Sequence, residues 1–212
     1  MEKDTKTKHN TQKRSEKGFD GVGQFVREVV KIFFMALVII VPIRVFLFQP
    51  FFVNGASMEP NFSNGQYLIV NEFGYKKTDI AFDRYSLFSV EPSKDLVRDD
   101  VIVFRYPKSP KQSFIKRVIG LPGERVVIRE GQVKIFNANN PQGMLLDESD
   151  ILPIGKQTIG TVDETLSEKE YFVLGDNRAF SHDSRAWGPV KKSDVIGKVF
   201  LRAWPLRDAK VY

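Results

Sequence analysis

Apolar and polar residues are segregated along this chain of 212 residues. The first 23 residues are polar and charged and show no apolar periodicity, which is typical of a disordered segment. An uninterrupted apolar run occupies 32–43 and continues past Arg44 to Phe48. Beyond it, short runs of β-branched and aromatic residues alternate with turn residues, which is the pattern of strands. The pattern predicts three parts: a disordered basic tail over 1–23, an apolar helix over 24–48 and a β-rich domain over 49–212.

The runs in the β-rich part are bounded by glycine, proline, asparagine or aspartate, and Glu130-Gly131 between two of them predicts a hairpin. Helical periodicity is absent there. The stretches 72–98 and 137–170 have few strand patterns, so we expect loops, irregular strands or, over 137–170, a variable insertion. The fold class is therefore mostly β, an antiparallel and barrel-like domain preceded by one helix. The expected strands are 67–70, 101–106, 113–119, 125–129, 132–136, 171–174 and 195–204.

We interpret the apolar segment as a single transmembrane anchor. A bilayer core needs roughly 17–25 residues, so 32–43 is short by itself. Extension to Phe48, with Lys31 and Arg44 reaching toward the interfaces, meets the lower end of that range. A cleavable leader has a similar apolar length but a much shorter charged start. A buried core helix would leave the lysine-rich tail unexplained.

The charge distribution predicts the orientation of this anchor. The net charge is +6, and basic residues crowd the tail. Lysine and arginine are retained on the cytoplasmic side of a span, so we expect a cytoplasmic N-terminus and an extracytoplasmic β-domain. No interleaving of basic and aromatic residues follows the tail, which argues against nucleic acid. The expected partner of the anchor is a lipid bilayer.

The residue types present restrict the chemistry. The chain has no cysteine, which excludes thiolate catalysis, zinc–thiolate sites and disulfides. The aspartates at 99, 100, 176 and 183 fit no calcium-loop spacing. We therefore expect no metal and no cofactor.

Ser57 follows the apolar segment directly and needs a base to act as a nucleophile. The two histidines are His9, in the tail, and His182. Ser181-His182-Asp183 has the letters of a triad, but neighbouring side chains diverge and three consecutive residues do not form a relay. His182 is therefore expected to be a solvated loop residue.

Lysine is the alternative base. Its ordinary pKa near 10.4 keeps it protonated at neutral pH, so it must be desolvated to accept a proton. Lys116 lies between Phe114-Ile115 and Val118-Ile119, in a more apolar setting than other lysines of the β-domain. Arg117 is expected to point to the opposite face, toward solvent. On spacing alone, a surface lysine on a half-exposed strand remains the favoured alternative.

Three motifs together resemble type I signal peptidases, and the resemblance covers about 32–205. It implies a membrane-anchored serine/lysine endopeptidase that removes N-terminal signal peptides from exported preproteins. The reaction would take place at the outer membrane surface, on substrates with small residues at positions −1 and −3 from the cut. The motifs are Ser57-Met58-Glu59-Pro60, Lys116-Arg117-Val118-Ile119-Gly120-Leu121-Pro122-Gly123-Glu124, and Gly175-Asp176-Asn177-Arg178 with Ser181 and Asp183-Ser184-Arg185.

The resemblance also implies roles for individual residues. It makes Ser57 the nucleophile and Lys116 the general base. The counterpart of Ser181 hydrogen-bonds the lysine amine, and those of Asp183 and Arg185 hold the framework. Further supporting positions are Asp176, Gly55 and Met58, although Met58 can equally be a core or lipid-facing residue.

Three positions depart from the family pattern. Asn61 stands where threonine is usual, and Asp99 stands where glycine is usual. Some members carry a serine two residues before the nucleophile. Gly55 has no hydroxyl there, so backbone N–H groups such as that of Ser57 are expected to bind the oxyanion.

Two other functions fit part of the sequence. A membrane-anchored, non-catalytic assembly or binding module on the same fold would need neither Ser57 nor Lys116. A related self-cleaving repressor would need a DNA-binding helix pair at the N-terminus, where this chain has an apolar segment.

Overall fold

The computed structural model describes residues 16–46, 48–82 and 85–212, with side chains described for 21–40, 48–77 and 89–212. The chain divides into two compact units, Met1–Val45 and Phe46–Tyr212. Residues 1–15, where most of the disordered tail was expected, lie outside the described residues.

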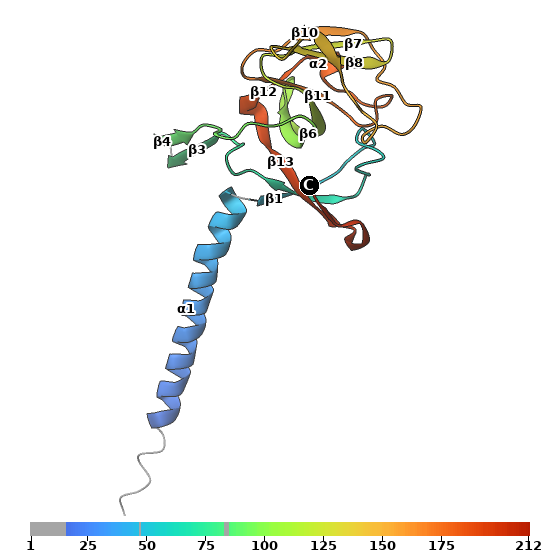
Figure 1. Ribbon diagram of the computed structural model, residues 1–212. Helices are drawn as coiled ribbons and strands as arrows, with labels where there is room; N and C mark the ends of the chain where they lie inside the picture. The colour runs from blue at the N-terminus through green and yellow to red at the C-terminus, as the bar shows by residue number, and fades with distance from the viewer. Residues whose placement is uncertain (1–15, 47, 83–84) are drawn as a thin grey trace, which may run out of the picture. The chain divides into compact units, whose positions relative to one another are not determined.

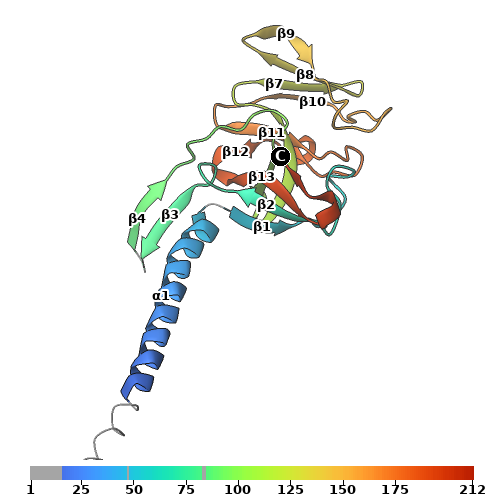
Figure 2. The same ribbon diagram turned by 60° about the horizontal axis from the view of Figure 1, so that its bottom comes forward.

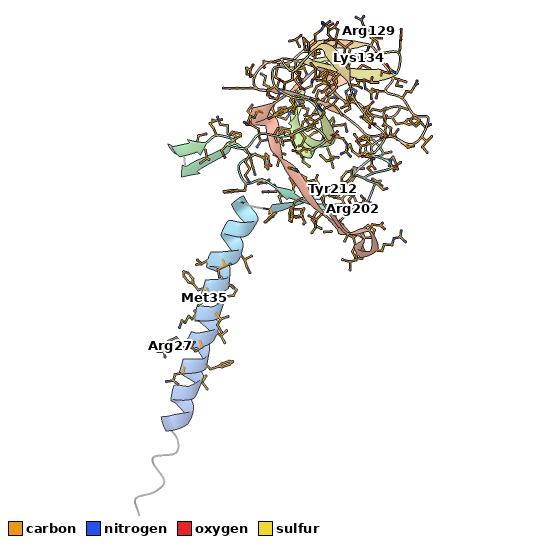
Figure 3. The ribbon with its side chains drawn as sticks, in the orientation of Figure 1. Arg27, Met35, Arg129, Lys134, Arg202 and Tyr212 are labelled. Carbon is orange, nitrogen blue, oxygen red and sulfur yellow. The ribbon has the colours of Figure 1, made fainter. Side chains whose placement is uncertain are left out.

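The described residues of the first unit form one long helix, α1 (Glu16–Phe46), which begins before the expected position 24 (Figure 1). Residues 16–23, expected to be disordered, are therefore helical. Arg27 and Met35 both project from its surface (Figure 3). Among the described residues, no helix combines the length and the apolar character that crossing a bilayer requires. The anchor expected over 24–48 is therefore not confirmed, and its last part, 41–47, has no described side chains.

The second unit contains antiparallel sheets, as predicted (Figure 1). The large sheet has the strand order β1-β2-β13-β5-β6-β11-β12, and β14 also pairs with β13. This order runs from β1 to β12 without closing among the described strands, so a barrel is not confirmed. Its strands are β1 (Phe48–Phe52), β2 (Tyr67–Asn71), β5 (Val101–Tyr106), β6 (Ser109–Gly120), β11 (Glu170–Leu174), β12 (Val190–Lys191), β13 (Val195–Trp204) and β14 (Lys210–Val211).

A small sheet of order β10-β7-β8-β9 forms a separate layer, and β3 pairs with β4 in a hairpin (Figure 2). Every expected strand is confirmed. The stretches 72–98 and 137–170, for which loops, irregular strands or an insertion were expected, contain the short strands β3, β4, β9 and β10. The remaining elements are β3 (Thr78–Phe82), β4 (Tyr85–Val90), β7 (Arg125–Arg129), β8 (Gln132–Asn137), β9 (Asn140–Leu145), β10 (Val162–Thr165), α2 (Ser184–Trp187) and the 3-10 turns η1 (Lys192–Asp194) and η2 (Leu206–Asp208).

The large sheet is buried on both faces around β5. Val101 and Val103 belong to one apolar cluster, whereas Ile102 and Phe104 belong to another. Successive side chains of a strand point to opposite faces, so the continuous apolar run of β5 fills both clusters. A third cluster joins Ile119 of β6 to the small sheet. The second half of the neighbouring strand β6, from Lys116 to Gly120, is therefore largely shielded from water, whereas Pro110–Ser113 are exposed.

Candidate active site

Ser57 lies in the turn that connects β1 to β2, and its backbone is held on two sides. Before it, Gly55 has a φ of 99°, in the left-handed region that favours glycine, and donates its N–H to Asn64 Oδ1 at 2.9 Å. Asn177 donates its backbone N–H to Ser57 O at 3.0 Å and its Nδ2 to Ala56 O at 3.1 Å. The serine turn is thus fixed to a loop more than one hundred residues later.

Met58 fills the core beneath the serine. It is 1% exposed and packs in the cluster that includes Phe62 and Leu68. Its side chain anchors the turn from below, and it is not among the residues that line the groove at Ser57. Of the two alternatives given for Met58, the structure supports the core residue.

Lys116 lies on β6 opposite Ile102 of β5 and is 3% exposed. Its Nζ lies 2.7 Å from Ser57 Oγ and 2.8 Å from Ile115 O. Burial lowers the pKa of Lys116 to about 8, although the negative charges of Asp183 and Asp176 partly oppose the change. The alternative of a surface lysine is therefore wrong, and the two residues that the sequence singled out are in contact.

The prediction that Arg117 points into solvent is also wrong. Its guanidinium donates to both carboxylate oxygens of Asp176, at 2.8 and 2.6 Å, and to Asp99 O at 2.8 Å. The reason is topological: β11 pairs with β6 at Leu174 opposite Arg117, so the residues that follow β11 cover this face of the strand. The side chain of Asp176 is fully buried and neutralised by this pair.

Asn61 joins the same network and explains how one departure from the family pattern is accommodated. Its Nδ2 donates to Asp176 Oδ2 and to Ile151 O, each at 2.9 Å. Its backbone oxygen accepts from Arg202 Nη1 at 2.8 Å. Arg202 in turn lies over the ring of Tyr212 (Figure 3). Asn61 therefore ties the serine turn to the loop after β11 and to strand β13.

Asp183 and Arg185 brace this loop. The fully buried Asp183 carboxylate accepts from Gly175 N at 3.0 Å and from Arg185 Nε and Nη2 at 2.8 Å each. Burial alone would raise the pKa of Asp183, but the Arg185 charge and these hydrogen bonds outweigh it and hold the pKa below its usual value. Arg185 Nη2 also donates to Arg178 O at 2.8 Å. The pair acts as a frame for residues 175–178.

Ser181 does not make the hydrogen bond to the Lys116 amine that the resemblance implied. Its hydroxyl is buried and has no hydrogen-bond partner among the described residues, although it lies near Asp183 and helps to lower the pKa of that carboxyl. A methyl group on Gly175 would overlap both Ser181 Oγ and Ser57 O. Gly175 is therefore packed against the serine turn with no room for a side chain.

A groove of about 330 Å³ opens at Ser57 and Lys116. Apolar side chains form most of its walls, and Phe180 and His182 also line it. His182 is exposed, as expected, and its Nε2 lies 3.4 Å from Tyr106 Oη. The other apolar lining residues include Phe51, Val53, Leu68, Val103, Phe114 and Ile115.

Asp99, the second departure, has a φ of 71°, a left-handed conformation that is uncommon for residues other than glycine. This explains why glycine is usual at the position. Burial raises the pKa of Asp99 above its ordinary value, against the opposing charge of Arg117.

Several functional positions were missed by sequence reasoning. Arg117, Asn61, Gly175 and Asn177 all hold the site together through contacts between distant segments. Their place within or beside the three motifs was the sequence signal that could have identified them. In the part of the chain that the structure describes, no three histidine, aspartate or glutamate side chains gather as a metal site would require.

Comparison with known proteins places this geometry in a family. A family model described as signal peptidase, peptidase S26, matches residues 26–204. Signal peptidase I from Bacillus caldolyticus is 33% identical over 187 residues, covering 82% of this chain and 90% of that protein. Signal peptidase I from Pseudomonas fluorescens is 30% identical over 211 residues, covering 84% of this chain and 73% of that protein.

A crystal structure of a signal peptidase I from Enterococcus faecalis V583 matches 50% of this chain and 97% of its own, with 33% identity and a TM-score of 0.41. The matches to the family model and to the two relatives confirm the resemblance read from the three motifs. The chain therefore belongs to the signal peptidase family, peptidase S26, and is a serine protease of the signal peptidase I type.

Proposed function

We propose that Ser57 and Lys116 form a catalytic dyad that cleaves signal peptides from exported preproteins. The observation that carries the proposal is the 2.7 Å contact between Lys116 Nζ and Ser57 Oγ, inside a buried setting that lowers the pKa of the lysine. With a pKa of about 8, roughly a tenth of the lysine is neutral at pH 7. An unperturbed lysine would be neutral in less than about one molecule in a thousand.

The reaction begins when the neutral Lys116 amine accepts the Ser57 hydroxyl proton and Ser57 Oγ attacks the scissile carbonyl. The backbone N–H of Ser57 stabilises the oxyanion, since Gly55 donates its own N–H to Asn64. Lys116 then returns the proton to the leaving amine, which is the new N-terminus of the mature protein. Water attacks the acyl-enzyme and Lys116 accepts a proton from that water. The acyl–Oγ bond then breaks, Lys116 passes the proton to Ser57 Oγ, and the signal peptide leaves with a free carboxylate.

The other site residues position this pair. Asp183 and Arg185 fix the backbone of Gly175, and Asn177 holds the carbonyls of Ala56 and Ser57. This frame keeps Ser57 Oγ within reach of the amine throughout the cycle. We assign Ser181 a supporting role, in which its hydroxyl turns toward the Lys116 amine once the lysine has lost its proton.

The groove supports a preference for small side chains in the substrate. Its walls beside Ser57 are apolar, and a volume of about 330 Å³ is shared by several substrate residues. Signal peptides with small residues at −1 and −3 would fit such walls. The signal peptidase I relatives support preproteins as the substrate class.

We propose that the chain is anchored by its apolar N-terminal segment, with the basic tail in the cytoplasm and residues 49–212 outside. The uninterrupted apolar run at 32–43 and the lysine-rich tail support this topology. Protease added to intact cells should then digest the β-domain and spare the tail. Loss of the tail with protection of the β-domain would reverse the orientation.

The dyad is tested with full-length protein in detergent and a preprotein substrate. Ser57→Ala and Lys116→Ala should each abolish cleavage, and the double variant should be no worse than either, because members of one relay are not additive. Lys111→Ala is the matched control, since Lys111 is an exposed lysine on the same strand. Substantial cleavage by either single variant would exclude the dyad. Failure of the wild type to cleave would favour the non-catalytic module.

A further inference from the structure

A second hollow of about 290 Å³ lies on the other side of the serine turn from the groove. We call it the distal hollow and define it by Pro60, Leu152, Pro153, Lys156 and Phe180, which are among the residues that line it. Apolar side chains supply most of its exposed surface, although polar residues such as Gln157 and Asn177 also line it. Four charged residues also line it, and the two acids Glu59 and Asp176 balance the two bases Lys156 and Arg178, so the hollow has no strong preference for either sign.

Phe180 connects the two cavities, because it lines both the groove at Ser57 and the distal hollow. Its side chain is 79% exposed, more than that of any other phenylalanine whose side chain the structure describes. An aromatic ring shared by two adjoining cavities offers a bound peptide a continuous apolar surface. The exposure of Phe180 is explained if a peptide covers it.

The catalytic turn separates the two cavities. Ala56 and Ser57 line the groove, whereas Glu59 and Pro60 of the same turn line the distal hollow. Asn177 also lines the hollow and holds the carbonyl of Ser57. A peptide that crosses Ser57 from the groove therefore reaches the distal hollow within a few residues, at about 3.3 Å of chain per residue.

The far wall of the hollow is preformed. Residues 152–157 belong to a loop that is flanked by the half-buried Glu148 and the buried Thr158, and the side chains of both contact Arg178. Ile151 in the same loop is buried and accepts a hydrogen bond from Asn61. The wall is thus tied to the network that positions the serine turn.

We propose that the distal hollow binds the first residues of the mature protein, on the leaving side of the scissile bond, and selects an apolar side chain there. This inference rests on the proposed function, in which the groove with small apolar walls holds the end of the signal peptide. A peptide runs through the site in one direction, so the cavity beyond Ser57 receives the segment that follows the cut. The apolar lining of Pro60, Leu152 and Phe180 favours leucine-like residues over polar ones.

The test uses two preprotein peptides that are identical except after the cut. One carries leucine at the third, fourth and fifth mature positions, and the other carries serine there. The full-length wild type should show a kcat/KM about tenfold higher for the leucine peptide, which is the order expected for one apolar side chain in a pocket. Leu152→Ser should reduce this ratio to about one.

The matched control is Ile154→Ser. Ile154 belongs to the same loop and is fully exposed, but it does not line the distal hollow, so its replacement should leave the ratio unchanged. A wild-type ratio of one, or a ratio that Leu152→Ser leaves unchanged, would overturn the distal hollow while the peptidase assignment stands. If the wild type cleaves neither peptide, the proposed function fails, and the hollow's role as a substrate site fails with it.

Discussion

Replacement of Lys116 by methionine should inactivate the enzyme and make it more stable at neutral pH. Methionine keeps an unbranched apolar side chain of similar length and removes the amine that lies against Ser57 Oγ and Ile115 O. In the wild type, folding transfers this amine from water to a site that is 3% exposed. The ammonium form of Lys116 is therefore disfavoured in the folded state, and the methionine variant avoids this desolvation free energy.

The magnitude follows from the pKa of Lys116, which falls from 10.5 to about 8 on folding. At pH 7 this difference destabilises the folded wild type by ~3 kcal/mol. The variant also loses the two hydrogen bonds of the Lys116 amine, which lowers its gain in stability by about 1 kcal/mol. The loss is no larger because the half-buried Ser57 hydroxyl can form a hydrogen bond to water instead. The variant should thus be ~2 kcal/mol more stable than the wild type at pH 7.

The pH dependence has a definite sign. Between about pH 8 and 10.5 the unfolded lysine binds a proton that the folded one has lost, so wild-type stability rises with pH through this window. At pH 10 the destabilisation of the folded wild type by Lys116 falls below about 1 kcal/mol. The variant and the wild type should then have nearly equal free energies of unfolding. Other titrating groups are present in both proteins and cancel in the difference.

Urea unfolding of the full chain in detergent, at pH 7 and pH 10, measures this difference. Trp187 and Trp204 report on the β-unit by fluorescence, and they are the only tryptophans of the chain. Lys111→Met controls for the loss of one lysine charge, since Lys111 is exposed. A difference in unfolding free energy between Lys116→Met and wild type that is the same at both pH values would refute desolvation of Lys116.

Three further predictions concern the chemistry and its frame. The acidic limb of the kcat/KM profile should have its midpoint near pH 8, since burial lowers the pKa of Lys116 to about that value; activity that appears only above about pH 10 would exclude a buried base. Gly175→Ala should reduce kcat at least about a hundredfold with the fold intact by circular dichroism, because the new methyl group displaces Ser181 and the serine turn; wild-type kcat would contradict the close approach. Arg117→Met should reduce the unfolding free energy by about 3–5 kcal/mol at pH 7, because it leaves the buried Asp176 carboxylate unpaired. The double variant Arg117→Met, Asp176→Leu should regain much of that unfolding free energy. If the double variant is as unstable as Arg117→Met alone, the stabilising role of the ion pair is contradicted.

Local sequence predicted most of the strands of the large sheet and the β7–β8 hairpin. Runs such as 101–106 and 125–129 consist of residues that favour an extended backbone, so their structure was evident without knowledge of their partners. Strand β9 was not evident, because Asn140–Leu145 contains few such residues and is extended through its pairing with β8. Its pairing with a neighbouring strand, not its own composition, makes it a strand.

The three motifs likewise identified the family from the sequence alone, and they predicted the residues of the proposed dyad. They did not determine the environment that makes the chemistry work. Lys116 and Ser57 lie 59 residues apart, and Asn61 and Asp176 lie 115 apart, so neither contact is visible in a local pattern. Burial is a property of the packed chain, because a side chain loses water only when distant segments cover it.

Arg117 shows most clearly what a local sequence pattern does not predict. Alternation along β6 places it on the face opposite Lys116, and the sequence gives no reason to expect that face to be covered. The pairing of β11 with β6 brings Asp176 over that face and converts a predicted surface cation into a buried ion pair. The distal hollow arises in the same way, from a serine turn, a loop over 152–157 and the residues after β11 that only the tertiary fold brings together.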